Sequence, residues 1–390
     1  MKVLQVVKTS EGAAWAFDQA DALIKRGIEV VTVMPNLTGK VAQRYKESGY
    51  PLLEADFSLP LNRPWQYFSR KKNIRKIVDE VQPDLIHLHF VTNIVMLRLS
   101  LRKNRIPRIF QVPGPLHLES FLFRMLDIKT ATKNDYWIGT CEKTVNIYRE
   151  NHIPEHRLFL GYYGGYGGDQ CDRYKNQGDI LHKEFQIDSE RKIVGMVSYT
   201  YKPKWYARQK RGIKGHEDFA DAIAIVRKTH PEVMAVVIGG PWGNSQKYFE
   251  KVRAYAHDVC GEHIVFTGTR NDIKDIYCEL DIVVHPSHSE NLGGAAESLA
   301  AARPTISTNI GGFPDIVKDG ETGYTVPMKN PEALAEAICK MLSDENQAKV
   351  MAEKGQALVR SLLDIENTAD VVAKIYQTIL LEKDEKEVKN

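Results

Sequence analysis

The sequence predicts an α/β protein built from two doubly wound domains. Short runs rich in Val and Ile alternate with stretches of helical periodicity along the chain, which is the pattern of parallel sheets covered by helices. A length of 390 residues favours two domains over one. Four glycines within the five residues 164–168 indicate a flexible connector near the middle of the chain.

The first half of the chain opens with a β-α-β pattern. A strand is expected at Val3–Val7, followed by the turn Ser10-Glu11-Gly12 and a helix over Ala13–Lys25. Gly27 closes that helix, because glycine accepts the left-handed backbone that often follows a helix, and Glu29–Met34 is the next strand. Further strands are expected at Leu85–Leu88, Arg108–Val112, Trp137–Thr140 and Leu158–Leu160.

The second half restarts the same alternation with a strand at Lys192–Val197 and a helix at Glu217–Lys228. The connector places the domain boundary between residues 168 and 169, so that the second domain covers 169–363. A last helix is expected at Asp364–Leu381, followed by a charged tail, Glu382–Asn390, that should be frayed. Further strands are expected at Val233–Ile238, His263–Thr267, Asp281–His285, Thr305–Thr308 and Gly323–Val326.

Composition excludes several classes of protein. The five cysteines are scattered and lack ligand spacing, which indicates free thiols in a reducing compartment rather than a disulfide frame or a zinc site. The first residues form a short strand, too brief for the core of a signal peptide, and no apolar run has the length of a spanning helix. We therefore expect a cytoplasmic protein whose contact with a membrane, if it has one, is peripheral.

Positive charge is concentrated in the first half. Between Arg63 and Arg108 there are 11 basic and 3 acidic residues, a net charge of +8. The stretch Trp65–Lys76 mixes aromatic and basic side chains at helical spacing, which suits anionic lipid headgroups at the inner face of the plasma membrane. A solvated basic helix is the equal alternative, and nucleic acid is not expected as a partner because no recognition motif occurs.

The most informative run is Pro286–Pro304, PSHSENLGGAAESLAAARP, directly after the apolar strand. It places Glu290 and Glu297 around a Gly-Gly turn at the start of an Ala-rich helix. A helix N-terminus with glycines offers N–H groups and a positive dipole end to a phosphate. Carboxylates beside that phosphate can bind sugar hydroxyls. Together these features indicate a nucleotide sugar.

This run resembles that of retaining glycosyltransferases of family 4, which have Pro-Ser-x-x-Glu, a Gly-containing turn, a second Glu and an Ala-rich helix. Family members usually have seven residues between the two glutamates, whereas this chain has six. The resemblance spans nearly the whole chain and is most specific over residues 281–327. It implies the GT-B fold, in which two facing Rossmann-like domains enclose an interdomain cleft and the last helix (364–390) packs back on the first domain. It also implies that the first domain (1–168) binds the acceptor and the second (169–363) binds the nucleotide sugar.

By this resemblance the residues of the run have separate roles. Glu290 binds the donor hexose and steadies positive charge at the anomeric carbon, and Glu297 accepts hydrogen bonds from the ribose hydroxyls. A solvated turn carboxylate and a plain first-turn acid are the alternatives. Backbone N–H groups for the diphosphate are expected from Asn291, Leu292, Gly293 and Gly294.

Cations are also expected near the diphosphate. Lys214, in Lys214-Gly215, matches the second of two family cations, and the Arg that the family places earlier is missing after Val197. The inserted segment Lys202–Arg211 offers Arg208, Lys210 and Arg211 as replacements, and Arg208 is assigned to the donor site. A cation is required because the leaving diphosphate gains negative charge in the transition state.

The first domain is expected to contribute Gly12 and a histidine. Gly12 stands where the family has a Gly-Gly loop against the donor phosphates. His117 matches a family histidine that touches the donor sugar better than His89 does, although both follow strands and either could be structural. In the second domain, the turn Gly311–Asp315 is an even choice between a wall of the base pocket and a plain loop.

The resemblance implies a hexosyltransferase that uses a nucleotide sugar, with UDP-sugar favoured, and retains the anomeric configuration. No Asp-x-Asp triplet occurs, so no metal site and no cofactor besides the donor substrate are expected. A glycan or lipid-linked acceptor in cell-surface polysaccharide or glycolipid synthesis is implied. The alternatives are a sugar-nucleotide epimerase with the same fold and a non-catalytic two-lobed sugar-binding protein.

Overall fold

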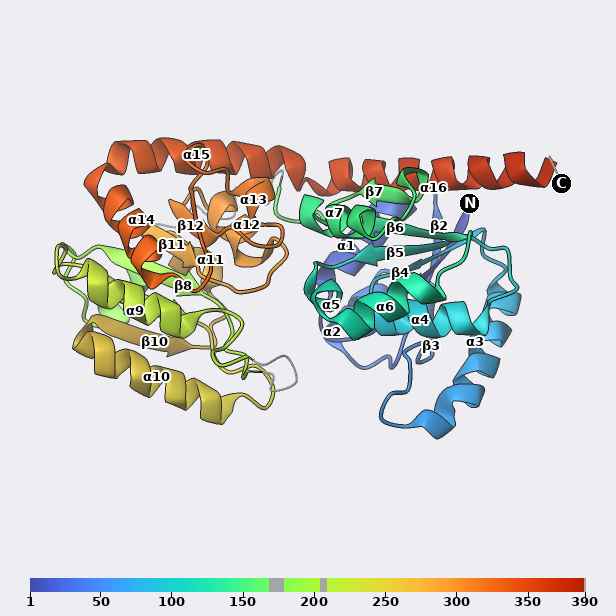
Figure 1. Cartoon of the computed structure of the whole chain (residues 1–390), viewed down its shortest axis with the longest axis horizontal. Helices are drawn as coiled ribbons and strands as arrows, with labels where there is room; N and C mark the ends of the chain where they lie inside the picture. Colours follow the sequence, from blue (N-terminus) through green and yellow to red (C-terminus); the bar gives the residue numbers. More distant parts are fainter. Residues whose placement is uncertain (168–178, 204–208, 389–390) are drawn as a thin grey trace. The chain divides into compact units, whose positions relative to one another are not determined.

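The computed structural model describes residues 1–167, 179–203 and 209–388 (Figure 1). The chain divides into two compact units. The first is Met1–Gly165 together with Leu362–Asn390, and the second is Tyr166–Ser361. Each unit has its own sheet and its own buried cores.

The first unit contains a parallel sheet of seven strands in the order β3-β2-β1-β4-β5-β6-β7. The order reverses between β1 and β4, which is the topological switch point where doubly wound sheets bind ligands. The strands are β1 (Lys2–Val6), β2 (Glu29–Met34), β3 (Leu52–Glu54), β4 (Leu85–Leu88), β5 (Arg108–Val112), β6 (Asp135–Gly139) and β7 (Leu158–Leu160). The helices are α1 (Ala14–Lys25), α2 (Lys40–Glu47), η1 (Pro64–Gln66), α3 (Tyr67–Val81), α4 (Val91–Ser100), α5 (Leu116–Glu119), α6 (Phe121–Thr130), α7 (Glu142–Glu150), η2 (Glu155–Arg157) and α16 (Ile365–Val388).

Alternation along the strands sends side chains to opposite faces of this sheet. In β1, Leu4 and Val6 join one core, whereas Val3 belongs to a core on the other face. That second core is completed by α16, which packs beside α1 although it lies more than 340 residues later in the chain. The Tyr376 hydroxyl of α16 is 2.5 Å from His87 Nδ1 of β4, and Arg26 binds the Asp370 carboxylate. The C-terminal helix is therefore part of the first unit's core.

The second unit contains a parallel sheet of six strands in the order β10-β9-β8-β11-β12-β13. The order reverses between β8 and β11. The strands are β8 (Ile193–Val197), β9 (Met234–Ile238), β10 (Ile264–Gly268), β11 (Ile282–His285), β12 (Thr305–Thr308) and β13 (Tyr324–Val326). The helices are α8 (Ile180–Glu184), α9 (His216–Val226), α10 (Gln246–Cys260), η5 (Gly261–His263), α11 (Ile273–Tyr277), α12 (Gly293–Ala300), α13 (Phe313–Ile316), α14 (Pro331–Ser343) and α15 (Glu345–Leu362).

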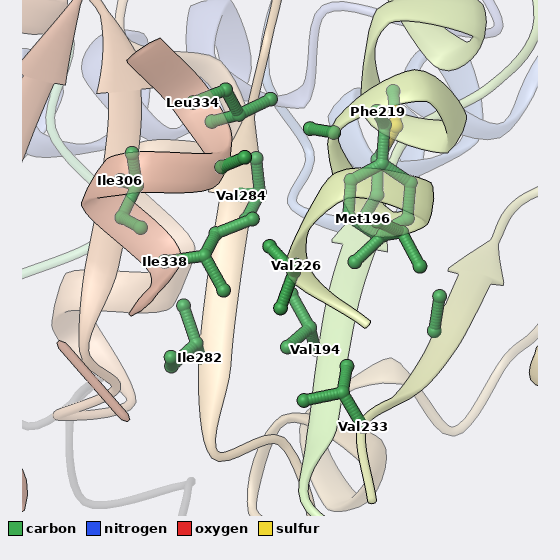
Figure 2. Close-up of a cluster of buried hydrophobic side chains, with 14 of the residues drawn as sticks. Val194, Met196, Phe219, Val226, Val233, Ile282, Val284, Ile306, Leu334 and Ile338 are labelled. Atoms are coloured by element: carbon green, nitrogen blue, oxygen red, sulfur yellow. The ribbon is translucent and has the colours of Figure 1, made fainter. Parts of the chain in front are cut away.

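The main core of the second unit lies between its sheet and the helices α9 and α14 (Figure 2). Met196 and Val284 extend from neighbouring strands toward Phe219 and Ile338 of the covering helices. All four side chains are almost completely buried. This packing fixes β8 and β11 side by side, and it thereby fixes the loops that leave their carboxyl ends.

Most expected elements are present with ends shifted by one or two residues, but one strand was not expected and one expectation was wrong. The strand β3 was missed because Leu52 and Leu53 are followed by a charged residue and show no alternation. The tail from Glu382 was expected to fray, whereas α16 continues to Val388. The end of the expected connector, Gly168-Asp169, lies outside the described residues.

Within the described ranges, no helix has the length and apolar character needed to cross a bilayer. The same residues hold no group of three or more His, Cys, Asp or Glu side chains arranged to bind a metal ion.

Candidate functional site

The carboxyl ends of β8 and β11 meet at the switch point of the second unit, and a small pocket lies there. Ser198 from the end of β8 and Phe313 from α13 line it. Lys214 and Glu290 also line it and form an ion pair with each other through Nζ and Oε2. Each of these two side chains is only 19% exposed, so the pair is partly shielded from water. The structure therefore brings together two residues that are 76 positions apart in the chain.

The turn that carries Glu290 is tightly held. The Asn291 N–H donates to Glu290 Oε1 over 3.1 Å. Gly293 has φ +39°, and a Cβ there would lie 2.8 Å from the Glu290 carboxyl carbon. Gly311 has φ +56°, and a Cβ there would lie 1.7 Å from the Glu290 carbonyl oxygen. Hence the turn at Gly311, which the sequence left open, packs against the backbone of Glu290.

The position of Gly215 explains why a glycine follows Lys214. It has φ +74°, and a Cβ there would lie 2.1 Å from the carbonyl oxygen of Pro286. Only glycine lets the start of α9 approach the β11–α12 loop so closely. This approach places Lys214, one residue earlier, beside Glu290.

The N-terminus of α12 faces the same pocket. Leu292 is its N-cap residue, and its apolar side chain makes no capping hydrogen bond to the first N–H groups of the helix. Gly294 lines the pocket, and a Cβ there would lie 2.8 Å from His285 Cε1. Bare N–H groups and the positive end of the helix dipole suit a bound phosphate.

His285 is a pocket residue that sequence reasoning missed. It ends β11, and its Nε2 is 3.0 Å from Ser298 Oγ. Burial, with the nearby charge of Lys214, lowers the pKa of His285 to about 3, so the ring stays neutral at physiological pH. The only indication in the sequence is that His285 is the last residue of a predicted strand, directly before Pro286-Ser287.

Glu297 lies further along α12 and has a partner of its own. The buried Tyr277 of α11 donates its hydroxyl to Glu297 Oε2 over 3.1 Å. Burial raises the pKa of the Glu297 carboxyl, while this hydrogen bond and the charge of Lys274 act in the opposite direction. One carboxylate oxygen is thus held by the protein. Tyr277 could not be recognised from the sequence, because nothing in its own segment marks it.

The structure bears on the three residues that could replace the missing family Arg. Arg211 is bound by the carboxylates of Asp218 and Asp221 at 2.5 and 2.7 Å, so it stabilises the start of α9. Lys210 is exposed. Arg208, the residue assigned from the sequence, lies outside the described residues.

The residues expected from the first unit lie at two places on its sheet. Gly12 follows β1 and is exposed, and a Cβ there would make only an ordinary contact with Thr9 Cγ2 at 3.9 Å. The left-handed residue of that loop is Ala13, with φ +65°. The left-handed backbone of this loop therefore falls on Ala13, one residue after the glycine that the sequence indicated.

His117 belongs to α5 and is attached to a buried ionic cluster. Its Nε2 is 3.2 Å from Asp127 Oδ2, and Asp127 also binds Arg98 at 2.8 Å. Burial alone would raise the pKa of Asp127, but the hydrogen bond from His117 and the charge of Arg98 lower it to about 2. Because the carboxylate holds Nε2, only Nδ1 of His117 remains for a ligand.

His89, the weaker candidate, is completely buried after β4. Its Nδ1 is 2.9 Å from the Tyr163 hydroxyl, and its ring packs edge-on against Trp15 at 5.0 Å. These contacts give it a structural role in the first unit.

Among the sequence-predicted site residues, the second unit brings together Lys214, Glu290, Asn291, Leu292, Gly293 and Gly294, with Glu297 in the second turn of the same helix. Gly12 and His117 belong to the other unit. The assembled part has a cation, bare helix N–H groups and two separately held carboxylates, which suits a phosphorylated sugar.

Two family models match the chain, one in each unit. The model described as "Glycosyltransferase Family 4" matches residues 13–162, and "Glycosyl transferases group 1" matches residues 206–358. The capsular polysaccharide biosynthesis glycosyltransferase CapM of Staphylococcus aureus is 22% identical over 99% of both chains.

Another relative, the D-inositol 3-phosphate glycosyltransferase of Acidothermus cellulolyticus, is 28% identical over 44% of this chain. The match covers 40% of that relative's length. Among solved structures, Anabaena HepE in complex with UDP has a TM-score of 0.80 at 18% identity, over 97% of this chain and all of its own. This likeness shows the GT-B fold. With one family model on each unit and this fold throughout, the chain belongs to the glycosyltransferases of family 4.

Proposed function

We propose that this protein is a retaining glycosyltransferase that moves a hexosyl group from a nucleotide sugar, with UDP-sugar favoured, to an acceptor hydroxyl. The observation that carries the proposal is the Lys214–Glu290 pair at the uncapped N-terminus of α12. This arrangement supplies positive charge for a diphosphate and a carboxylate for a sugar at adjacent points.

Each residue contributes differently to the proposed transfer. The diphosphate binds at the N-terminus of α12 and to Lys214, which stabilise the negative charge that develops as it leaves. Glu290 then turns from Lys214 to the hexose hydroxyls and supports positive charge at the anomeric carbon. Glu297 accepts from the ribose hydroxyls through the oxygen that Tyr277 leaves free.

Retention and independence of metal are parts of the same proposal. The acceptor attacks the face from which the diphosphate leaves, and the leaving phosphate takes the acceptor proton. Lys214 and the helix dipole provide the charge that a metal ion supplies in other transferases. Among the described residues, Cys260 and Cys339 are free thiols, which supports a cytoplasmic setting.

The rivals have less support. Both matched family models describe glycosyltransferases, which favours transfer over epimerisation. A purely sugar-binding protein would not need the cation and the helix N-terminus that suit a leaving diphosphate. CapM acts in capsular polysaccharide biosynthesis, and we propose a similar setting with a glycan or lipid-linked acceptor.

A ligand panel tests the donor site. UDP, GDP, ADP and their hexose conjugates are added without metal, and the shift in melting temperature is measured, since a bound ligand stabilises the folded state. We expect one nucleotide to be preferred, with UDP tested first. No shift with any of them would overturn the proposal.

A substitution tests the catalytic residue. Glu290→Gln should lower kcat by about 100-fold or more, because charge stabilisation at a transition state is worth several kcal/mol. The affinity for the free nucleotide should persist. Glu353→Gln, an exposed carboxylate on α15, is the matched control. Unchanged turnover in Glu290→Gln would remove this residue from the mechanism.

We also propose peripheral contact of η1 and α3 with anionic lipid. Trp65 and Phe68 are 73% and 78% exposed, and Lys72 and Lys76 are exposed on the same segment. Aromatic rings beside cations suit a lipid headgroup region. The net charge counted from the sequence overestimates the positive charge of this surface, because Arg98 and Arg108 are buried and paired with aspartates.

Vesicle sedimentation tests this contact. The protein should bind vesicles that contain phosphatidylglycerol more than pure phosphatidylcholine vesicles, and salt should weaken the binding. A Trp65→Ala/Phe68→Ala variant should bind less, whereas Leu381→Ala, an exposed apolar side chain on α16, should not. Equal binding of the two vesicle types would contradict the proposal.

A further inference from the structure

Helix α6 of the first unit buries a carboxylate and exposes apolar side chains. Phe121 and Leu122 are 70% and 56% exposed, whereas Asp127 of the same helix has no exposed surface. Apolar side chains ordinarily take the buried positions of a surface helix, and a carboxylate removed from water is costly unless it is paired. The position of Asp127 therefore depends on its partners.

The carboxylate of Asp127 is held from several sides. Arg98 Nη1 and the Trp137 indole N–H donate to its Oδ1 over 2.8 and 3.2 Å. The Tyr148 hydroxyl donates to Oδ2 over 2.5 Å, and His117 Nε2 lies 3.2 Å from the same oxygen. These partners come from α4, β6, α7 and α5, so the carboxylate is fixed with respect to both the sheet and its helices.

His117 is the member of this cluster that reaches the surface. Arg98, Trp137 and Tyr148 are at most 1% exposed, whereas the side chain of His117 is 12% exposed. His117 also follows β5 at the carboxyl edge of the sheet, where ligand sites of α/β proteins form. The cluster thus connects a buried charge to one ring that a ligand can contact.

Asp127 and Tyr148 can only accept a hydrogen bond from His117 Nε2. The pKa of about 2 keeps Asp127 ionised at neutral pH, so it has no proton to donate. The Tyr148 hydroxyl lies 3.3 Å from Nε2, but its single proton is donated to Asp127. A neutral imidazole carries its proton on one nitrogen and accepts at the other. The proton of neutral His117 is therefore on Nε2, and Nδ1 presents a lone pair.

We propose that Asp127 and Tyr148 are positioning residues that set His117 to accept, at Nδ1, a hydrogen bond from a hydroxyl of the transferred hexose. A ring nitrogen without a proton accepts from a sugar hydroxyl, but it offers no donor to a diphosphate oxygen. The bond made by one ring nitrogen fixes the role of the other, as it does in other functional histidines. This proposal rests on the proposed function and on the family resemblance, which implies that His117 touches the donor sugar.

Nitrogen NMR of isotope-labelled histidine rings tests the tautomer without any activity. The spectra are recorded at about pH 8.5, where imidazoles are ordinarily neutral. The signals of His117 are those that disappear in His117→Ala. We expect the proton on Nε2 in the wild type, and Asp127→Asn, whose amide can donate to Nε2, should lose this preference. A proton on Nδ1 in the wild type would overturn the proposal.

Affinities for UDP-glucose and UDP test the assignment to the hexose, with another conjugate in place of UDP-glucose if the ligand panel selects one. His117→Ala and Asp127→Asn should each weaken UDP-glucose binding about fivefold to tenfold, because one hydrogen bond to the hexose is lost. The affinity for UDP should stay unchanged. The double variant should show no further loss, since Asp127 acts through His117, whereas a merely structural role would add a loss of its own.

Tyr148→Phe keeps the test decisive if Asp127→Asn does not fold, because it leaves the ion pair between Asp127 and Arg98 in place. It should weaken UDP-glucose binding about twofold to threefold, since one of two acceptors at Nε2 is lost. Tyr45→Phe, which removes another buried hydroxyl of the first unit, is the matched control and should have no effect.

The outcomes separate this proposal from the proposed function. Additive losses in the double variant, or an unchanged affinity for UDP-glucose in both His117→Ala and Tyr148→Phe, would overturn the positioning role and leave the donor site standing. An equal loss of UDP affinity would mean that His117 contacts the nucleotide and would also overturn it. A wild type that binds neither ligand would refute the proposed function and this assignment together.

Discussion

At the scale of single residues, the two carboxylates of the site differ because their partners differ. Glu290 is held by a cation, Lys214, and by one backbone N–H. Glu297 is held by a neutral hydroxyl, that of Tyr277, and burial raises the pKa of its carboxyl. A carboxylate paired with a cation can exchange that partner for a ligand, whereas one fixed by a tyrosine keeps its orientation.

The role of Tyr277 can be tested against that of Glu297. Glu297→Ala should weaken nucleotide binding by about 10-fold to 100-fold, because a hydrogen bond to a charged group contributes about 1.5–3 kcal/mol. Tyr277→Phe should weaken it up to about tenfold, with kcat unchanged, because only the orientation of Glu297 is lost. Calorimetry with the nucleotide gives both values.

A second tyrosine controls for the loss of a hydroxyl. Tyr255 donates its hydroxyl to Asp221 over 2.5 Å on the far part of α9. Tyr255→Phe should leave nucleotide affinity unchanged. If Tyr277→Phe has the same affinity as the wild type, Tyr277 does not position Glu297.

Ala13 shows strain at one residue. An L-residue other than glycine in the left-handed region is strained by about 1–2 kcal/mol, and Ala13 has φ +65°. Ala13→Gly should therefore raise the free energy of unfolding by about 0.5–1 kcal/mol, after the larger entropy loss of glycine on folding is included. Urea unfolding measures this change, and a lower stability would contradict it. Ala14→Gly, inside α1, should instead lower stability.

At the scale of elements, helix N-termini do most of the positioning. Both α9 and α12 start at the carboxyl ends of the central strands and have no side-chain cap. Their starts can converge because Gly215 tolerates the Pro286 carbonyl at its side. The site thus depends on the contact between two helix starts as much as on its charged groups.

Alanine variants of two glycines separate the effect of that contact from the effect of backbone strain. Gly215 and Gly320 have the same φ of +74°, but a Cβ at Gly320 meets nothing within 4 Å. Gly320→Ala should lower stability by about 1 kcal/mol from backbone strain alone. Gly215→Ala should lower it by at least about 2 kcal/mol, because it adds a steric clash.

Activity provides the second readout of the same pair. Gly215→Ala should also reduce kcat/KM, since Lys214 moves with the start of α9, while Gly320→Ala should not. Equal losses of stability in the two variants would show that the Pro286 contact can relax.

At the scale of the whole molecule, buried histidines make both units sensitive to acid. Burial is the main cause that lowers the pKa of His87 and His285 to about 3 and of His216 to about 4. His89 is also shifted well below its usual pKa by burial. Each unit contains two of these four residues.

The sign of the pH dependence follows from these directions. Unfolded histidines take up protons below about pH 6.5, whereas the folded ones stay neutral until near pH 4. Stability should therefore be complete above pH 6.5 and fall as the pH decreases toward 4. Each histidine contributes at most about 1.4 kcal/mol per pH unit.

Denaturant unfolding at a series of pH values measures this loss. It should begin above pH 5, where carboxylates have hardly started to titrate. His216→Gln should reduce the slope, whereas the exposed His257→Gln should not. A stability that stays constant from pH 7 to pH 5 would rule out this role of the buried histidines.

The sequence by itself determined the local structure. Apolar alternation, helical periodicity and turn glycines are properties of neighbouring residues, so strands such as β2 and β12 were predicted to the residue. The Pro286–Pro304 run indicated a phosphate and sugar site because a strand, a Gly-Gly turn and a helix start are contiguous in the chain. The sequence also indicated both members of the ion pair, Glu290 from this run and Lys214 from the Lys214-Gly215 pair.

Tertiary structure alone decided which side chains are partners. Arg211 is neutralised by Asp218 and Asp221, and Tyr277 reaches Glu297, because helices fold back over the sheet. Tyr199 and Trp242 likewise come within 5.1 Å of each other only because the ends of β8 and β9 lie side by side. These contacts join residues on different elements, and a linear pattern holds no information on which distant groups share a space. Burial and pairing, and with them the charge available at the surface, are therefore set by packing.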